Sequence, residues 1–295
     1  MSDFLIFSLT IAGIYAIMAL GLNLQAGYAG LLNFGHIAFA GIGAYATGIV
    51  TAAGYPAVAG AALGVLVAIV LGWCIARLGR QLGADYWGIA TLAIAEILRT
   101  VATNEDWLTG GAQGISAIRF LFGDLPKPWG ALSFLALVLL LLAVLAAACQ
   151  RLGDGRFGRA LRLMREEPKL AACMGYDLRA LKSRAIMAGA ATTALAGSLY
   201  AHYMSFVGPD YMLASETFML WTMLMIGGMG NTVGVITGVV LVQAAYGLVP
   251  FAKDSLQFGS DIAGALRIGL IGLILLASLL WRSQGLIPEK LRKIP

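Results

Sequence analysis

The sequence predicts an all-α membrane protein, a polytopic bundle of about nine transmembrane helices in a single domain. Apolar residues make up 60% of the 295-residue chain and charged residues only 12%, whereas a soluble chain carries about 25% charged residues. Four long segments contain no Asp, Glu, Lys or Arg, namely residues 4–76, 128–150, 185–209 and 217–252. A helix needs about 20 apolar residues to cross a bilayer, and these segments lack the alternation of membrane β-strands. Helices are therefore the predicted spanning elements.

The expected spans follow the apolar runs. In chain order they cover residues 4–23, 36–55, 57–76, 86–104, 129–149, 185–206, 215–230, 232–252 and 263–281. The first has neither a basic leader nor a small-residue cleavage site, which predicts a retained span and not a removed signal peptide. Two connections are long: an outer one at 104–130, rich in Gly and Pro, and an inner one at 150–184. We expect the outer connection to be an ordered loop with room for a short interfacial or re-entrant helix.

The Lys and Arg residues divide unevenly between the two sets of loops. Arg77, Arg80, nine residues within 150–184 and four in the C-terminal segment place fifteen of the twenty on one side. The other side receives Arg99, Arg119, Lys127, Lys253 and Arg267. Because short loops with excess positive charge stay in the cytoplasm, the C-terminus is predicted inside and the N-terminus outside. This placement also explains the net charge of +5 without a nucleic-acid partner.

The chain offers little for catalysis. Its two histidines, His36 and His202, are far apart and lie in no HExxH, DxxD or GxSxG context. There is no GxxxxGK[ST] sequence, so the chain is not expected to bind ATP phosphates by itself. Its three cysteines form no CxxC pair, which argues against a disulfide or zinc site. We expect a non-catalytic protein without a metal or another cofactor.

Charged residues within the spans are candidates for a solute pathway. A charge at the bilayer centre costs at least about 2.5 kcal/mol, so such residues usually face the bundle interior or a water-filled path. Glu96 and Arg99 lie three residues apart and either anchor the outer end of their helix as a pair or act in a gate. Glu216 begins a span, where it either binds the N-terminal donors of its helix or lies at the external mouth of the pathway.

A glycine-rich stretch, GYAGLLNFGHIAFAGIGAYATG, begins after the first expected span and runs into the second. Its glycines allow helices to approach closely or allow a helix to break, and broken backbone at membrane depth occurs only where protein or a cavity surrounds it. Asn33 and His36 lie at that break. They are either structural hydrogen-bonding partners or residues of the pathway.

A second glycine-rich stretch, GGMGNTVGVITG, joins two spans almost without a loop. Gly227, Gly228 and Gly230 with Asn231 are expected to form a tight cytoplasmic turn. The two glycine-rich stretches lie in opposite halves of the chain and either mark a weak inverted repeat, as in some transporters, or reflect the frequency of glycine in membrane helices.

The inner connection is the only soluble-looking surface that the sequence predicts. Within it, MREEPKLAACMGYDLRALKSR predicts a short helix after Pro168, a turn at Gly175 and a second helix that leads into the sixth span. Nine basic and four acidic residues in 150–184 are compatible with binding to anionic lipid. The apolar residues ahead of Gly175 favour the alternative, a short helix that docks into the groove of a partner.

Several of these motifs resemble one family over nearly the whole chain, from Asn23 to about Trp281. GLLNFGHIAFAGIGAY, DYWGIATLAIAEILR followed by LTGGAQGI, and MREEPKLAACMGYDLRALKSRA are similar to the permease subunits of branched-chain amino acid ABC importers, M-type subunit. The resemblance implies that the inner loop carries an ATPase-coupling helix. By position its residues are Glu166, Glu167, Ala171, Ala172 and Gly175, while Lys169 and Leu170 depart from the broader EAA pattern.

The resemblance also implies partners and a location. These are a sister permease in a heterodimer, two ATP-binding subunits, a periplasmic solute-binding protein and the bacterial inner membrane, with leucine, isoleucine or valine as solute. Sister permeases for urea, short amides and aromatic acids share the scaffold, so the solute stays open. A self-contained secondary transporter or channel is a second hypothesis, although scarce intramembrane carboxylates make ion coupling hard to build. A membrane-embedded transferase is a third, without gathered catalytic groups to support it.

Overall fold

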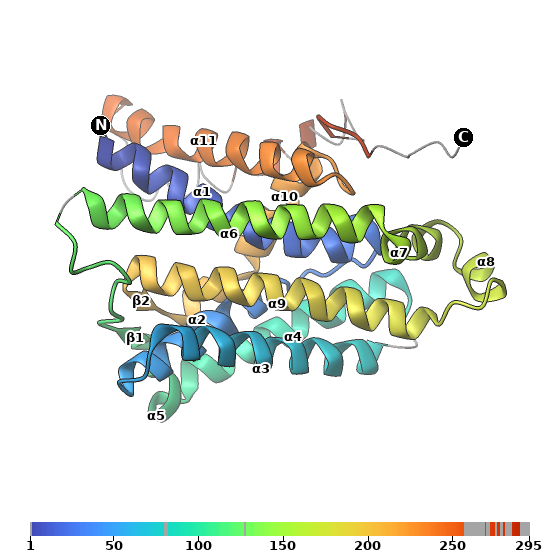
Figure 1. Ribbon diagram of the computed structural model, residues 1–295, viewed down its shortest axis with the longest axis horizontal. Helices are drawn as coiled ribbons and strands as arrows, with labels where there is room; N and C mark the ends of the chain where they lie inside the picture. The colour runs from blue at the N-terminus through green and yellow to red at the C-terminus, as the bar shows by residue number, and fades with distance from the viewer. Residues whose placement is uncertain are drawn as a thin grey trace.

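The computed structural model describes residues 2–79, 82–126, 128–256, 269, 272–274, 276–277, 280 and 285–289. Long helices run side by side along the longest axis of the molecule (Figure 1). They are α1 (Ser2–Asn23), α2 (Ile37–Ala52), α3 (Ala57–Leu78), α4 (Ala84–Asn104), α6 (Trp129–Asp154), α9 (Leu178–Met204), α10 (Ala214–Gly227) and α11 (Thr232–Leu256). Each covers most or all of one of the first eight expected spans.

Three helices in the described part of the chain are long and apolar enough to cross a membrane by length and composition. They cover Asp3–Tyr28, Ala57–Leu78 and Trp129–Asp154, and two further apolar helices are shorter. On α3 and α6 many large apolar side chains are exposed, including Leu66, Val70, Leu140 and Val144, as a hydrocarbon environment favours. The count of nine stays a prediction, and the expected span 263–281 lies largely outside the described residues.

Short elements fill the two long connections. The outer connection contains α5 (Asp106–Thr109), the 3-10 turn η3 (Gly111–Gln113) and strand β1 (Ile115–Ser116). β1 pairs antiparallel with β2 (Phe206–Val207), and the turn η4 (Pro209–Met212) follows β2. The inner connection contains α7 (Arg156–Glu166) and α8 (Pro168–Cys173). Over the described residues the fold is therefore all-α apart from one two-residue strand pair, which the prediction of an all-α chain did not include.

Helix α9 packs against α1, α2 and α3 and forms the centre of the bundle. Glycine makes the closest of these crossings possible: a Cβ at Gly43 would collide with the backbone of Ala194, and one at Gly197 with that of Ala40. Small residues on both helices thus let α2 and α9 pack backbone to backbone. Among the glycines of α2, this contact explains Gly43.

The connections gather at two opposite ends of the bundle (Figure 1). The α7–α8 end contains α7, α8, the start of α9 and residues 285–289; Arg77 at the end of α3 lines a cleft there with Arg179 and Arg184. The β1–β2 end contains the N-terminus, α5 and the strand pair. The sequence predicts that the first of these ends is cytoplasmic.

Candidate pathway and coupling site

The first helix ends in a break that is buried in the bundle. After α1 the chain forms a π-helical turn, η1 (Leu24–Tyr28), and stays non-helical until α2 begins at Ile37. Gly30 has a φ of +69°, a conformation that residues with a side chain rarely adopt. Gly30 is half-buried and borders a cavity, in line with the rule that non-helical backbone at membrane depth lies against protein or a cavity.

Asn33 is held by the protein at both ends of its side chain. Its Nδ2 donates to Gln25 Oε1 at 2.7 Å, and its Oδ1 accepts from the backbone N–H of Gly35 at 2.9 Å. The indole N–H of Trp221 donates to the Asn33 carbonyl at 3.0 Å. Asn33 is only 2% exposed, so its observed role is to tie the break to η1 and α10.

His36 is fully buried at the junction of α1, α2 and α9. Its Nε2 lies 2.7 Å from Thr193 Oγ1 and 3.2 Å from the Met18 carbonyl oxygen. Its Nδ1 has no hydrogen-bond partner among the described residues. Asn33 and His36 therefore both lie at the break, as the sequence predicts, and both make hydrogen bonds between helices.

Glu216 lies in the first turn of α10 and faces the interior. Its Oε2 accepts a hydrogen bond of 2.7 Å from the hydroxyl of Tyr15 in the middle of α1. The pair borders a cavity of about 150 Å³. The carboxylate thus bonds to another helix, whereas the sequence alternative had it bonding to the N-terminal donors of α10.

Glu96 and Arg99 form the expected pair on α4. Arg99 Nε donates to both carboxylate oxygens of Glu96 at 3.0 Å. The side chains are 51% and 27% exposed, respectively, and neither lines a cavity with Asn33, His36 or Glu216. The structure therefore separates this pair from the other candidate pathway residues.

The predicted short helix of the inner connection is α8, with Pro168 in its first turn. Ala171 is buried, whereas Glu166, Glu167 and Ala172 are exposed. Gly175 follows with a φ of +85°, and Asp177 then caps α9 by accepting from the N–H groups of Arg179 and Ala180 at 2.9 and 3.1 Å. The five coupling residues of the sequence analysis are thus close neighbours on one projecting hairpin (Figure 1).

A salt-bridge latch, defined here as Arg162, Arg165 and Glu289, joins this hairpin to the bundle. Glu289 accepts from Arg162 Nε and from Arg165 Nη2, the latter at 2.8 Å. Arg165 also donates to the carbonyl of Gly27 in η1, and the Arg162 guanidinium lies 5.1 Å from the centre of the Tyr28 ring. Burial alone would lower the pKa of Arg165, but its bonds to Glu289 and Glu166 outweigh this and raise it.

The C-terminal segment is itself tied to the turn between α10 and α11. The N–H groups of Leu286 and Ile287 donate to the carbonyls of Ile226 and Gly227 at 2.8 and 3.1 Å. In that turn Gly228 and Gly230 have φ values of +114° and +79°, which explains the glycines of the predicted tight turn. The N–H of Gly230 donates to Asn23 Oδ1 at 2.8 Å, so the turn is also bonded to the end of α1.

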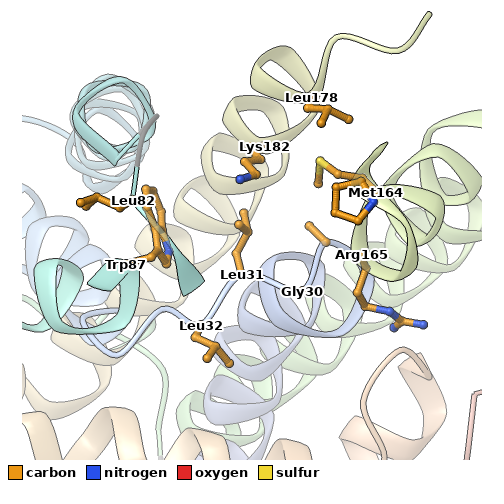
Figure 2. A pocket seen from close by; sticks show the side chains of 11 residues that line it. Gly30, Leu31, Leu32, Leu82, Trp87, Met164, Arg165, Leu178 and Lys182 are labelled. Carbon is orange, nitrogen blue, oxygen red and sulfur yellow. The ribbon is translucent and has the colours of Figure 1, made fainter. Parts of the chain in front are cut away.

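A second cavity, of about 220 Å³, lies between the helix break and the hairpin (Figure 2). Its walls come from the break, α4, α7, α8 and α9: Ala29, Gly30, Leu31, Leu32, Leu82, Trp87, Met164, Arg165, Pro168, Leu178 and Lys182. Figure 2 shows Leu31 and Lys182 pointing toward each other across it, while the Arg165 guanidinium points away from it. Residues 33–36 separate this cavity along the chain from the one beside Glu216.

Sequence reasoning missed the latch and the Tyr15–Glu216 bond. Their partners are 127, 124 and 201 positions apart, and no local spacing reveals such pairs. The positions of Arg162 and Arg165 on a basic helix favoured solvated or lipid-facing charges. Their burial was not apparent because Glu289 stands in an otherwise basic C-terminal segment.

Comparison with known proteins decides the family. A family model described as "Branched-chain amino acid transport system / permease component" matches residues 4–279. The chain belongs to this family. It is a non-catalytic transport component and an integral membrane protein, which confirms the family that the sequence motifs resemble and does not favour a self-contained transporter, a channel or a transferase.

Individual relatives cover nearly the whole chain. The probable branched-chain amino acid transport permease protein LivM of Methanocaldococcus jannaschii is 28% identical over 94% of this chain and 91% of its own length. The LivM permease protein of the Escherichia coli high-affinity system is 30% identical over 95% of this chain and 69% of its own length. The corresponding LivH protein is 24% identical over 93% and 94%.

One solved structure is also similar, PsaBC from Streptococcus pneumoniae in complex with Fab. It is 14% identical, with a TM-score of 0.48, over 94% of this chain and 91% of that chain.

Proposed function

We propose that this chain is the M-type permease subunit of an ATP-driven importer of branched-chain amino acids in a bacterial inner membrane. The assembly would contain a sister permease, two ATP-binding subunits and a periplasmic solute-binding protein. Family membership supports the permease role, and the names of the LivM and LivH relatives support the solute and a paired permease. The whole chain acts as one permease domain, with residues 150–184 as its cytoplasmic coupling loop.

The coupling role is supported by the exposure of apolar side chains on one face of α8. Leu170 and Met174 are 50% and 63% exposed, so an apolar surface projects from the end of the molecule, and none of the described elements covers it. Ala171 is fully buried and anchors the other face of α8 to the hairpin. A short helix with one exposed apolar face and one anchored face fits the groove of a separate domain.

Motion of α8 has a mechanical route to the helix break. The hairpin leads through Gly175 directly into α9, the central helix, and α7 is joined by the latch to η1 and to the C-terminal segment. A partner can shift a conformational equilibrium only through contacts that differ between its states. Closure of ATPase subunits on α8 would therefore act on the break between the two cavities.

The test is reconstitution with and without the ATPase partners. The purified chain alone in liposomes is expected neither to hydrolyse ATP nor to accumulate radiolabelled leucine, since it lacks a phosphate-binding loop. The complete complex with its binding protein is expected to do both. ATP-independent leucine uptake by the isolated chain would overturn the subunit assignment, and ATP-driven uptake of urea or an amide but not of leucine would overturn only the solute.

A further inference from the structure

The cavity beside Glu216 has the chemistry of a binding site. It lies among the middle of α1, the first half of α2, the second half of α9 and the start of α10. Its lining consists of Tyr15, Met18, Ile37, Ala40, Gly41, Ala44, Gly197, Tyr200, Tyr211 and Glu216. Within the described part of the chain this lining contains one carboxylate and no Lys, Arg or His. The only charged group that a ligand would meet in this lining is therefore the Glu216 carboxylate, which favours a cationic group.

The polar groups of the cavity are only partly used by the protein. Tyr15 donates to Glu216 Oε2, and Oε1 has no hydrogen-bond partner among the described residues. The rings of Tyr200 and Tyr211 pack edge to face, with centroids 4.9 Å apart. Neither phenol hydroxyl has a hydrogen-bond partner among the described residues, so both can donate to a ligand. The site thus combines a free carboxylate oxygen with two free phenol hydroxyls.

The remaining wall is apolar and small. Met18 and Ile37 provide branched or flexible apolar surface, and Ala40 and Ala44 keep the α2 side open. A cavity of about 150 Å³ in another protein accommodates benzene, so this one is large enough for a branched aliphatic side chain. Methionine adapts its shape to such a group without a polar requirement.

We propose that this cavity binds an aliphatic amino acid, with its ammonium group on Glu216 and its branched side chain against Met18 and Ile37. The carboxylate of the solute would accept from the Tyr200 and Tyr211 hydroxyls. This inference rests on the proposed function and assigns the solute site within it. A charged hydrogen bond from the ammonium group to Glu216 gives selectivity for the amine. Without an amine, the Glu216 carboxylate would bond to Tyr15 alone.

The experiment measures binding of radiolabelled leucine to the assembled permease–ATPase complex in nanodiscs, without the solute-binding protein. Competition by isoamylamine, which has the amine but no carboxylate, is compared with competition by α-ketoisocaproate, which has the carboxylate but no amine. We expect isoamylamine to compete and α-ketoisocaproate to be weaker by about tenfold or more. Glu216→Gln is expected to weaken leucine binding by a similar factor.

Glu105→Gln is the matched control, since Glu105 is exposed and lies in the outer connection. It should leave leucine binding unchanged. Equal leucine binding by the wild-type and Glu216→Gln complexes would overturn the assignment of the binding site and leave the proposed function standing. If Glu216→Gln fails to assemble, equal competition by the two analogues on the wild-type complex overturns it. A wild-type complex that imports another solute and does not bind leucine overturns the proposed substrate, and the site assignment with it.

Discussion

Gly175 shows how a single residue shapes the coupling hairpin. Its φ of +85° and the lack of any atom within 4 Å of an added Cβ mean that a side chain there would act through the backbone alone. The N–H groups of Gly175 and Tyr176 donate to Ala172 and Ala171 at 3.0 and 3.1 Å. Gly175 therefore ends α8 and sets the angle at which the chain enters α9.

Replacing Gly175 with Val is expected to uncouple the complex without preventing its assembly. A β-branched residue with positive φ costs about 1–2 kcal/mol, and the chain can relieve this cost by changing the turn. Solute-stimulated ATP hydrolysis and leucine uptake should then fall by about tenfold, as measured in reconstituted complex. Size-exclusion chromatography checks that all subunits are still present.

Gly54 provides a closely matched control for this substitution. It also has a φ of +85° and no atom within 4 Å of an added Cβ, but it lies between α2 and α3 at the β1–β2 end. Gly54→Val should strain the backbone equally and leave coupling intact. Equal losses of coupling in the two variants would remove the hairpin from the mechanism.

At the scale of elements, the latch determines how rigidly α7 is held. The Glu289 side chain is 14% exposed and its Arg162 and Arg165 partners are 16% and 24% exposed. Removing the carboxylate leaves two arginines close together at the end of the bundle. Because removing one partner of a largely buried charge pair leaves the other charge uncompensated, the carboxylate should hold α7 in position against η1.

Glu289→Gln is expected to lower the free energy of unfolding of the α7 region by roughly 1–3 kcal/mol. Hydrogen exchange of the amides in residues 156–166 measures this, and faster exchange is the expected result. Asp124→Asn is the control, because the Asp124–Arg119 pair is 82% and 77% exposed and should contribute at most about 1 kcal/mol. Unchanged exchange in α7 of Glu289→Gln would show that the latch does not hold this helix.

The elements themselves were predictable to different degrees. Apolar runs located the long helices, but α6 extends beyond its run, to Asp154, because a helix can continue into water whereas counting apolar residues stops at the first charge. The start of α9 at Leu178 agrees with the second helix that the inner connection predicts, and Asp177 caps it. The strand pair β1–β2 was not predictable, since two residues on each side carry no periodic signal.

Site residues were predictable where glycine or sequence spacing marked them. The break after α1, the positive φ at Gly175 and the Glu96–Arg99 pair all follow from local sequence. Local sequence does not show that Asn33 is saturated by Gln25 and Trp221, or that Glu216 pairs with Tyr15. Those contacts depend on how the helices pack, which local sequence does not specify.

At the scale of the whole molecule, the two cavities lie on opposite sides of the buried break. One borders the α7–α8 end and contains Lys182; the other lies toward the β1–β2 end and contains Ala44. If ATP binding acts through the hairpin, the two cavities should open in alternation and never together. We expect this alternation to couple ATP binding to transfer of the solute.

Cysteine accessibility in the complete complex tests whether the two cavities open in alternation. Lys182→Cys and Ala44→Cys are placed separately in a chain whose Cys74, Cys149 and Cys173 are replaced by Ala, and an impermeant thiol reagent is added to nanodiscs with and without a non-hydrolysable ATP analogue. Trp107→Cys, on the exposed outer connection, should label equally in both states. The nucleotide is predicted to slow labelling at position 182 and to speed it at position 44. Two results would contradict alternating opening of the cavities. One is a nucleotide-dependent change in the same direction at both positions, and the other is no change at either position when the nucleotide binds.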